Sequence, residues 1–178
     1  MSYFNLKNIM GYIPTGAKLT IWNDLYKRGS KPGVKNLEYS YKGKDVKKLV
    51  DFVPKLIQTI FMPTMWQQKE ISVTEDTYEV YWYVFKDLDS FTYFRVDIEV
   101  KIDFKSGKAK IKLSEPVIVT EYPQETYWQK TFFYELLRLI WHNLFYNKKV
   151  EEYMDWAKLK ISCFEEKLIK YFDRLKGS

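Results

Sequence analysis

Residues 91–104 alternate between two kinds of side chain, and this alternation constrains the fold more than any other feature of the chain. The even-numbered residues are apolar except for Thr92, and the odd-numbered residues from Arg95 to Asp103 are all charged. Successive side chains of a β-strand point to opposite faces of the sheet, so the pattern predicts one long strand with an apolar face and a charged face. Another layer of the protein must cover the apolar face.

The sequence after this strand predicts a β-hairpin. Ser106 and Gly107 supply a two-residue turn, and a second alternating run follows at 108–114. With that turn, Ile102 lies opposite Ile111, and their apolar neighbours share the same face. A slip by one residue would set apolar side chains opposite lysines, so we expect the pattern to fix the register.

Two further segments extend the sheet. Residues 78–85 are rich in aromatic and β-branched side chains on both parities, which is typical of a strand covered on both faces. Pro116 marks a bulge or an edge position, after which residues 117–120 continue as a short strand. We therefore expect an antiparallel meander of three to five strands within residues 69–122.

Helices are predicted on either side of the sheet. Residues 45–61 carry an apolar stripe behind Asp45 as N-cap, and Pro54 inside the stripe predicts a kink or a split. After Pro123, residues 124–146 form a second helix with an apolar face wider than a simple surface helix needs. A third helix then runs to about residue 175.

This third helix carries apolar residues at alternating spacings of four and three, which is a heptad seam. The seam residues are Val150, Met154, Ala157, Ile161, Phe164, Leu168, Tyr171 and Leu175. One interpretation is an antiparallel helical hairpin, 124–175, in which the seam packs against 124–146. The alternative is a coiled-coil contact with a second subunit.

Residues 1–43 show the weakest pattern. We expect an irregular, basic N-terminal part, with a short helix at 17–26 and strand character at 37–41. The whole chain, 1–178, is then a single α+β domain, in which a kinked N-terminal helix and a long C-terminal helical hairpin cover the antiparallel sheet.

The composition indicates whether the chain folds and in which compartment we expect it. A hydrophobic content of 46% with 29% charged residues indicates a folded chain. No signal peptide or apolar run of transmembrane length is present, so we expect no membrane insertion. The single cysteine excludes an internal disulfide and favours a cytoplasmic protein. The preference for lysine over arginine resembles thermophile composition.

The net charge of +6 is concentrated in the N-terminal third, where a lysine-rich segment contains tyrosines. Lysines neutralise phosphates and exposed tyrosines stack on unpaired bases, so the segment is a candidate nucleic-acid-binding site. Its residues are Lys27, Arg28, Lys31, Lys35, Lys42, Lys44, Lys47, Lys48, Tyr39 and Tyr41. The simpler interpretation is a solvated loop that keeps the protein soluble.

The sequence offers no convincing catalytic or metal-binding constellation. His142 is the only histidine and Cys163 the only cysteine, and one of each does not make a zinc site of the usual type. The carboxylates of the long strand are interleaved with cations, which is typical of a solvated sheet face. We therefore expect no catalytic residue, no metal and no cofactor.

Aromatic residues are in surplus on the sheet, mainly within residues 78–93. If helices cover one face only, part of this set lies on the other face and marks a surface for a protein partner. We predict a non-catalytic binding or assembly protein, a homodimer that associates through this aromatic sheet face or through the heptad seam. The alternative is a nucleic-acid-binding accessory protein that uses the basic segment 27–48.

Overall fold

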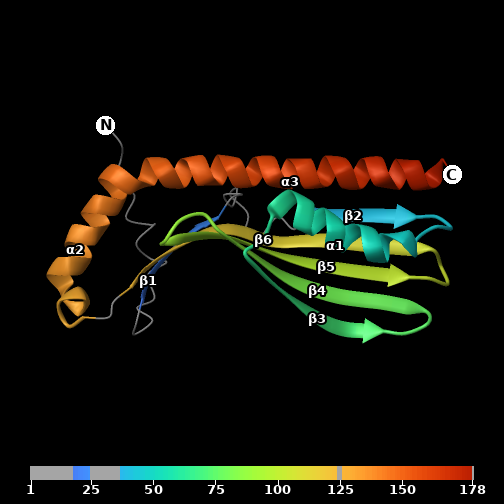
Figure 1. Cartoon of the computed structure of the whole chain (residues 1–178), viewed down its shortest axis with the longest axis horizontal. Coiled ribbons are helices and arrows are strands. Elements are labelled where there is room, and N and C mark those ends of the chain that lie inside the picture. Colours follow the sequence, from blue (N-terminus) through green and yellow to red (C-terminus); the bar gives the residue numbers. More distant parts are fainter. Residues whose placement is uncertain (1–17, 25–36, 124–125, 178) are drawn as a thin grey trace, which may run out of the picture.

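The alternating stretch becomes the central strand of a six-stranded antiparallel sheet in the computed structural model, which describes residues 18–24, 37–123 and 126–177 (Figure 1). The strands are β1 (Lys18–Asp24), β2 (Leu37–Lys42), β3 (Met65–Val73), β4 (Thr77–Asp87), β5 (Thr92–Asp103) and β6 (Lys108–Pro123). The helices are α1 (Lys48–Phe61), the short 3₁₀ turn η2 (Trp128–Lys130), α2 (Phe132–Trp141), the π-helical turn η3 (His142–Tyr146) and α3 (Asn147–Lys176).

The strand order is β1-β6-β5-β4-β3, and β2 pairs with the same edge of β6 as β1 does. β6 is long enough for both partners, because β2 pairs with its first half and β1 with its second half. The α+β class is therefore confirmed. The expected strand count and the limits 69–122 are wrong, since six strands run from β1 to residue 123.

The 17–26 helix is also a wrong prediction, because Lys18–Asp24 is a strand. Lys18 to Ile21 alternate between polar and apolar side chains, while Leu19, Trp22 and Leu25 fit a helical spacing. A run this short does not distinguish the two periods, and pairing with the end of β6 decides the outcome. The strand character of 37–41 is confirmed by β2.

The hairpin between β5 and β6 differs from the prediction by two residues. Ile102 pairs with Ala109 rather than Ile111, and the loop is 104–107. A shift of two keeps every side chain on its own face, so alternation does not detect it. The turn chemistry decides instead. The Ser106 amide donates to Oδ1 of Asp103 at 3.0 Å, and Gly107 takes a left-handed φ of 63°.

Pro116 lies at a bulge, as predicted. Arg95 pairs with Val117 but Asp97 pairs with Ser114, so Val96 alone faces Glu115 and Pro116. The bulge lies between the parts of β6 that pair with β1 and β2. β6 is otherwise one continuous strand rather than two.

The N-terminal helix α1 begins at Lys48 and not at an Asp45 cap. Asp45 instead closes the preceding turn, where its carbonyl accepts from the Lys48 amide at 3.1 Å. The helix runs through Pro54 without splitting. It ends at Met62, whose left-handed backbone lets its amide donate to the carbonyl of Gln58.

The C-terminal part is not a hairpin. α2 passes into α3 through η3 with no loop between them, so the chain bends instead of folding back on itself. Figure 1 shows α3 lying along the length of the molecule, with α2 turned away from it at the end near β1. Among the described helices, none is both long and apolar enough to cross a membrane.

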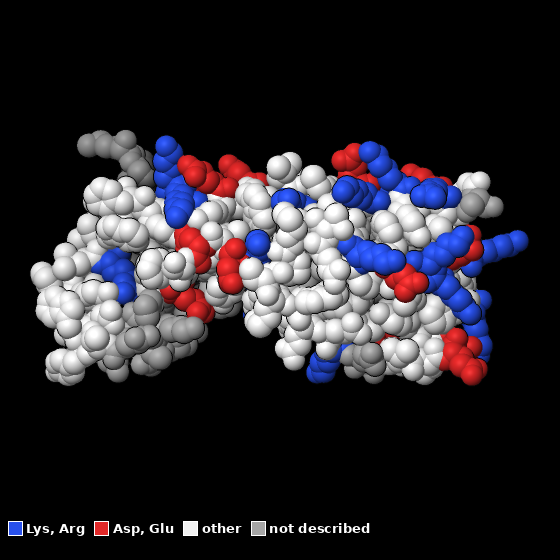
Figure 2. Space-filling view, in the orientation of Figure 1, with Lys and Arg blue, Asp and Glu red and all other residues white. Residues whose placement is uncertain are grey.

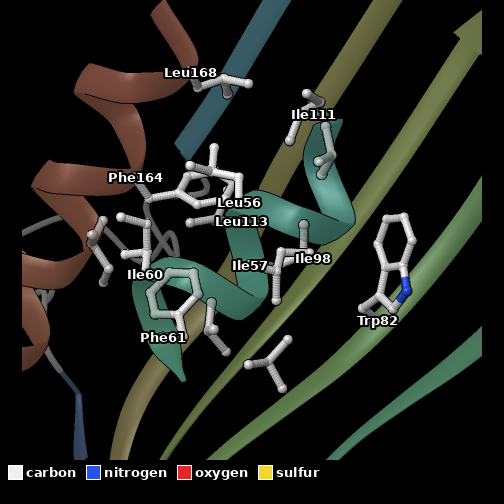
Figure 3. Close-up of a cluster of buried hydrophobic side chains, with 14 of the residues drawn as sticks. Leu56, Ile57, Ile60, Phe61, Trp82, Ile98, Ile111, Leu113, Phe164 and Leu168 are labelled. Carbon is white, nitrogen blue, oxygen red and sulfur yellow. The ribbon is translucent and has the colours of Figure 1, made fainter. Parts of the chain in front are cut away.

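The core lies between the sheet and the two covering helices, α1 and α3 (Figure 3). Phe61 of α1 joins the layers, because its ring lies 5.7 Å from that of Phe94 in β5 and 5.5 Å from that of Phe164 in α3. The ring of Phe52 stacks on that of Tyr171 at 3.6 Å. The helices therefore cover the face of the sheet that the alternation in β5 marked as apolar.

Candidate interaction surface

An apolar arm is the most unusual surface of the described chain. We define the arm as residues 126–146, which comprise η2, α2 and η3. Ten of its large apolar side chains are between 42% and 90% exposed: Tyr127, Trp128, Phe132, Phe133, Leu136, Leu137, Ile140, Trp141, Leu144 and Phe145. Figure 2 shows almost no charge over α2, whereas charged side chains gather over α3 and the far end of the sheet.

The arm helix has a well-defined start. The side chain of Thr131 caps it by accepting from the Tyr134 amide at 3.4 Å, and the Thr131 hydroxyl donates to the carbonyl of Trp128 at 2.7 Å. Glu135 lies in the first turn and Arg138 in the last, which suits the helix dipole. The local sequence therefore defines where the helix begins.

The exposed residues of α2 and η3 come in adjacent pairs at a spacing of four: 132–133, 136–137, 140–141 and 144–145. In an α-helix this spacing drifts around the axis by about 40° at each step, because a turn holds 3.6 residues. The π-helical turn η3 holds about one residue more than an α turn. It therefore reduces the drift at the last step, from the pair 140–141 to the pair 144–145.

The opposite side of the arm helix is polar and buried. Arg138, His142 and Tyr146 are 9%, 4% and 5% exposed, and all three pack on Tyr122 near the end of β6. The guanidinium of Arg138 lies 4.6 Å from the centre of the Tyr122 ring. An ordinary surface helix buries its apolar side and exposes its polar side. In this arm the arrangement is reversed.

Tyr122 and His142 are joined by a buried hydrogen bond. Burial lowers the pKa of His142, so the imidazole is neutral, and burial raises the pKa of Tyr122, so the phenol keeps its proton. The Tyr122 hydroxyl lies 2.9 Å from Nδ1 of His142, and the tautomer of the imidazole sets which of the two donates. In either direction the bond holds the arm against β6.

Asp89, in the loop between β4 and β5, anchors the junction of the arm with α3. Its Oδ1 accepts from the amides of Phe91 and Thr92 at 2.8 and 2.9 Å. Its Oδ2 accepts from the hydroxyls of Tyr146 and Tyr153 at 2.5 and 2.9 Å, and from Nζ of Lys149 at 3.2 Å. One carboxylate therefore ties a sheet loop to η3 and to the first turns of α3.

A directed chain of hydroxyls ends at the same carboxylate. Tyr146 has one hydroxyl proton and donates it to Asp89, so Thr92 must donate to Tyr146 across 2.7 Å. Thr120 must then donate to Thr92 across 3.1 Å. All of these oxygens are buried or half-buried, and a satisfied buried network of this kind fixes the geometry of the parts it joins.

The charge of Asp89 is strongly favoured in the folded chain. Burial alone would raise its pKa, but the hydrogen bonds from Tyr146, the Phe91 amide, Tyr153 and Lys149 outweigh burial and lower the pKa from 3.8 to about 2. The same contact, together with burial, raises the pKa of Tyr146. The junction is therefore ionic and fully formed at neutral pH.

The aromatic sheet face is the second candidate surface. Tyr81, Tyr83, Phe85 and Tyr93 lie on the face opposite the helices, whereas Trp82 is buried in the core. The side chains of this face contact one another. The hydroxyl of Tyr81 donates to Asp97 at 3.1 Å, and the rings of Tyr81 and Tyr83 lie 4.8 Å apart. A protein partner at this face stays a prediction.

Two charged groups add to those contacts. The guanidinium of Arg95 binds both carboxylate oxygens of Asp97, at 3.2 and 3.0 Å, and the hydroxyl of Tyr93 donates to Glu121 at 3.1 Å. Burial, with Glu121 beside the ring, raises the pKa of Tyr93 to about 12. The side chains of this face are half-buried by one another, and the arm presents far more apolar surface.

The basic segment is only partly within the described residues. Lys27, Arg28, Lys31 and Lys35 lie outside them. Lys42, Lys44, Lys47 and Lys48 are exposed.

The two tyrosines of that segment are not exposed. Tyr39 and Tyr41 point from β2 into the core and are 9% and 2% exposed, and the ring of Tyr41 lies 5.2 Å from that of Phe172. They do not present rings to a base in this conformation. Binding of nucleic acid by the lysines stays a prediction.

The heptad seam packs within the chain. Its residues are buried or half-buried against α1 and the sheet, including all eight positions of the predicted set: Val150, Met154, Ala157, Ile161, Phe164, Leu168, Tyr171 and Leu175. The seam does not pack against 124–146 as a hairpin, and Met154 and Tyr171 keep part of their side chains in solvent. The packing of the seam within one chain does not test whether the protein forms a homodimer.

The described part of the chain offers no metal site. Cys163 is half-buried beside the core. Within residues 18–24, 37–123 and 126–177, no group of three or more histidine, cysteine, aspartate or glutamate side chains is arranged to hold a metal ion.

Sequence reasoning identified the apolar face of 124–146 but assigned it to hairpin packing. The sequence gives no signal against that assignment. Arg138 and His142 lie on the side of the helix away from the apolar pairs, and a hairpin that leaves this polar side in solvent is the ordinary arrangement. Tyr122, at the end of the sheet, is the buried partner that periodicity does not reveal.

Comparisons with known proteins give no relative. No family model, no curated protein and no solved structure matches this chain.

Proposed function

We propose that this protein is a non-catalytic binding and assembly module. Its contact surface is the outer face of the arm, by which we mean the ten exposed apolar side chains named above. The observation that supports the proposal is the reversed arm helix, with Arg138 and His142 inside and apolar side chains outside. Exposed apolar surface is costly in water, and large patches of it mark interaction sites.

The size of the surface supports the same proposal. A fully exposed aromatic side chain has an accessible area of roughly 200 Å². On that basis, the six exposed aromatic residues of the arm present on the order of 800 Å² of accessible surface. They are Tyr127, Trp128, Phe132, Phe133, Trp141 and Phe145. The largest apolar patch of a typical monomer is only about 300–600 Å². A standard protein interface buries about 800 Å² on each partner, so the arm alone offers enough surface for one.

The junction supports a preformed surface rather than one that is ordered on binding. Asp89, Tyr146 and Tyr153 hold the base of the arm in one geometry, and Tyr122 holds its inner side. These polar groups are engaged with one another in positioning the arm, which is why we assign them a structural role and not a catalytic one. A preorganised surface loses less entropy when it binds.

The experiment compares two matched pairs of substitutions. Leu137→Lys with Leu144→Lys changes arm residues that are 47% and 70% exposed, and Ile169→Lys with Leu159→Lys changes α3 residues that are 43% and 61% exposed. Both variants gain the same charge. We expect the arm pair to lower binding of 1-anilinonaphthalene-8-sulfonate to dilute folded protein several-fold, and the α3 pair to leave it near the wild-type value. Equal dye binding by all three proteins would refute the proposal.

Nucleic-acid binding is the second candidate, and one observation favours it. Pairing of β2 with β6 sets Lys42 directly opposite Lys108, with Lys44 exposed nearby in sequence, so the basic character extends onto a second strand. Neutralised phosphates release counterions, and binding should therefore weaken steeply as salt rises.

The test uses labelled single-stranded DNA at low and high salt. Lys42→Glu with Lys108→Glu should abolish binding and remove the salt dependence, while Lys158→Glu with Lys170→Glu on α3 should have little effect. Salt-independent binding, or equal loss in both variants, would exclude this role. Cytoplasmic residence remains part of the proposal and rests on the single cysteine.

A further inference from the structure

We infer that the partner of the arm is a second copy of this chain, so that the protein is a two-fold dimer in which two arms pack outer face to outer face. This inference rests on the proposed function, since it names the occupant of the same surface. It differs from the dimer expected from the heptad seam, because most of the seam is already buried within its own chain.

The chemistry of the outer face suits a copy of itself. The ten exposed side chains that form it are uncharged and apolar, so two copies of these side chains meet without placing like charges together. In an isologous contact, the same patch supplies both sides of the interface. A strongly charged patch would oppose such self-pairing, and this patch carries no such charge.

The arrangement of the side chains also resembles an interface. Aliphatic Leu136, Leu137 and Ile140 lie in the middle of the stripe, and aromatic residues lie toward both ends. Aromatic anchors that surround a dry centre are typical of energetically important contacts. The exposed pairs follow one another along the whole of α2 and η3, which lets two helices contact over this length.

The available area is sufficient for a stable dimer. The aromatic residues alone present on the order of 800 Å² per arm, about what each partner buries in a standard interface. The four aliphatic side chains add to that area. Because the arm turns away from α3, two arms can approach without contact between the long helices (Figure 1).

Sedimentation equilibrium over a range of concentrations tests the inference. We expect wild type to reach twice the monomer mass of 21.6 kDa, and Leu137→Lys with Leu144→Lys to weaken self-association at least ~100-fold. The matched variant, Ile169→Lys with Leu159→Lys, should dimerise like wild type. A dimer that the arm pair leaves intact would overturn the inference.

Cross-linking locates the contact independently of stability. In a Cys163→Ser background, Leu136→Cys and Ile140→Cys, made singly, lie near the middle of the stripe, and Leu159→Cys on α3 is the control. We expect a disulfide-linked dimer on mild oxidation from at least one arm position and none from the control. Linking from the control alone would place the contact elsewhere and refute the inference.

The remaining outcomes separate this inference from the proposed function. A wild-type chain that stays monomeric yet binds the dye through the arm would overturn self-pairing and leave the proposed function standing. If that monomer also cosediments with phosphatidylcholine vesicles, a lipid surface is the occupant, and if it does not, a different protein is. A monomer whose dye binding is unaffected by the arm pair would refute both.

Discussion

Replacement of Asp89 by asparagine gives the most direct test of how the arm is held. The side chains are nearly the same size, and the amide oxygen can still accept from the Phe91 amide. The variant loses the negative charge that accepts hydrogen bonds from the hydroxyls of Tyr146 and Tyr153 and forms an ion pair with Lys149. We expect Asp89→Asn to destabilise the junction and, through it, the whole chain.

The magnitude follows from the pKa of Asp89. The value falls from 3.8 to about 2 on folding, and one pKa unit corresponds to about 1.36 kcal/mol, so ionised Asp89 contributes about 2 kcal/mol at neutral pH. Because the folded pKa is the lower one, this contribution is complete well above pH 3.8 and is lost as the pH falls through about 2. At about pH 3 roughly half of it remains.

The assay is urea denaturation of wild type and Asp89→Asn at neutral pH and at several values down to about pH 3. The difference in free energy of unfolding should be about 2 kcal/mol at neutral pH and should shrink as the pH falls. Asp155→Asn is the control, because Asp155 is 79% exposed and its pair with Lys158 lies on the helix surface. A neutral-pH difference below about 0.5 kcal/mol, or one that does not change with pH, would refute the reasoning.

Two further substitutions test the hairpin and the core. Gly107→Ala should destabilise by about 2 kcal/mol, because φ is 63° there and a Cβ would lie 2.7 Å from the Gly43 carbonyl oxygen. Gly177→Ala, where the nearest contact is 3.7 Å, should be nearly neutral in the same urea titration, and equal effects would contradict the left-handed turn. Phe164→Ala should cost about 3–5 kcal/mol by opening a cavity between α3 and α1. Leu159→Ala, on the exposed side of the same helix, should shift the urea midpoint little, and a larger loss there would contradict the packing of α3.

Much of the fold could be predicted because local periodicity reports which side of an element is apolar. The alternation in β5, the stripe of α1 and the seam of α3 were all identified from spacing alone. Each of these faces is buried in the structure. Pro116 was expected at a bulge or an edge position because proline does not donate to a ladder, and it lies at a bulge.

Periodicity could not give the register of the β5–β6 hairpin. Both candidate registers keep Ile102 and Ile111 on the core face, so the hydrophobic pattern scores them equally. The choice depends on the Asp103 side chain and on a left-handed Gly107, and the close approach of Gly43 makes that position tolerate only glycine well.

The sequence by itself determined the faces: an apolar side on β5, on α1, on α3 and on residues 124–146. Only the tertiary structure decided what each face meets. The spacing of apolar residues shows that a face is apolar. It does not show which segments pack on that face, because those segments lie far away in the sequence. The seam of α3 was expected to pack on 124–146 or on another subunit, and it packs on α1 and the sheet. The apolar side of the arm was thereby left without the partner assigned to it, because Tyr122 and Asp89 hold the polar side inward.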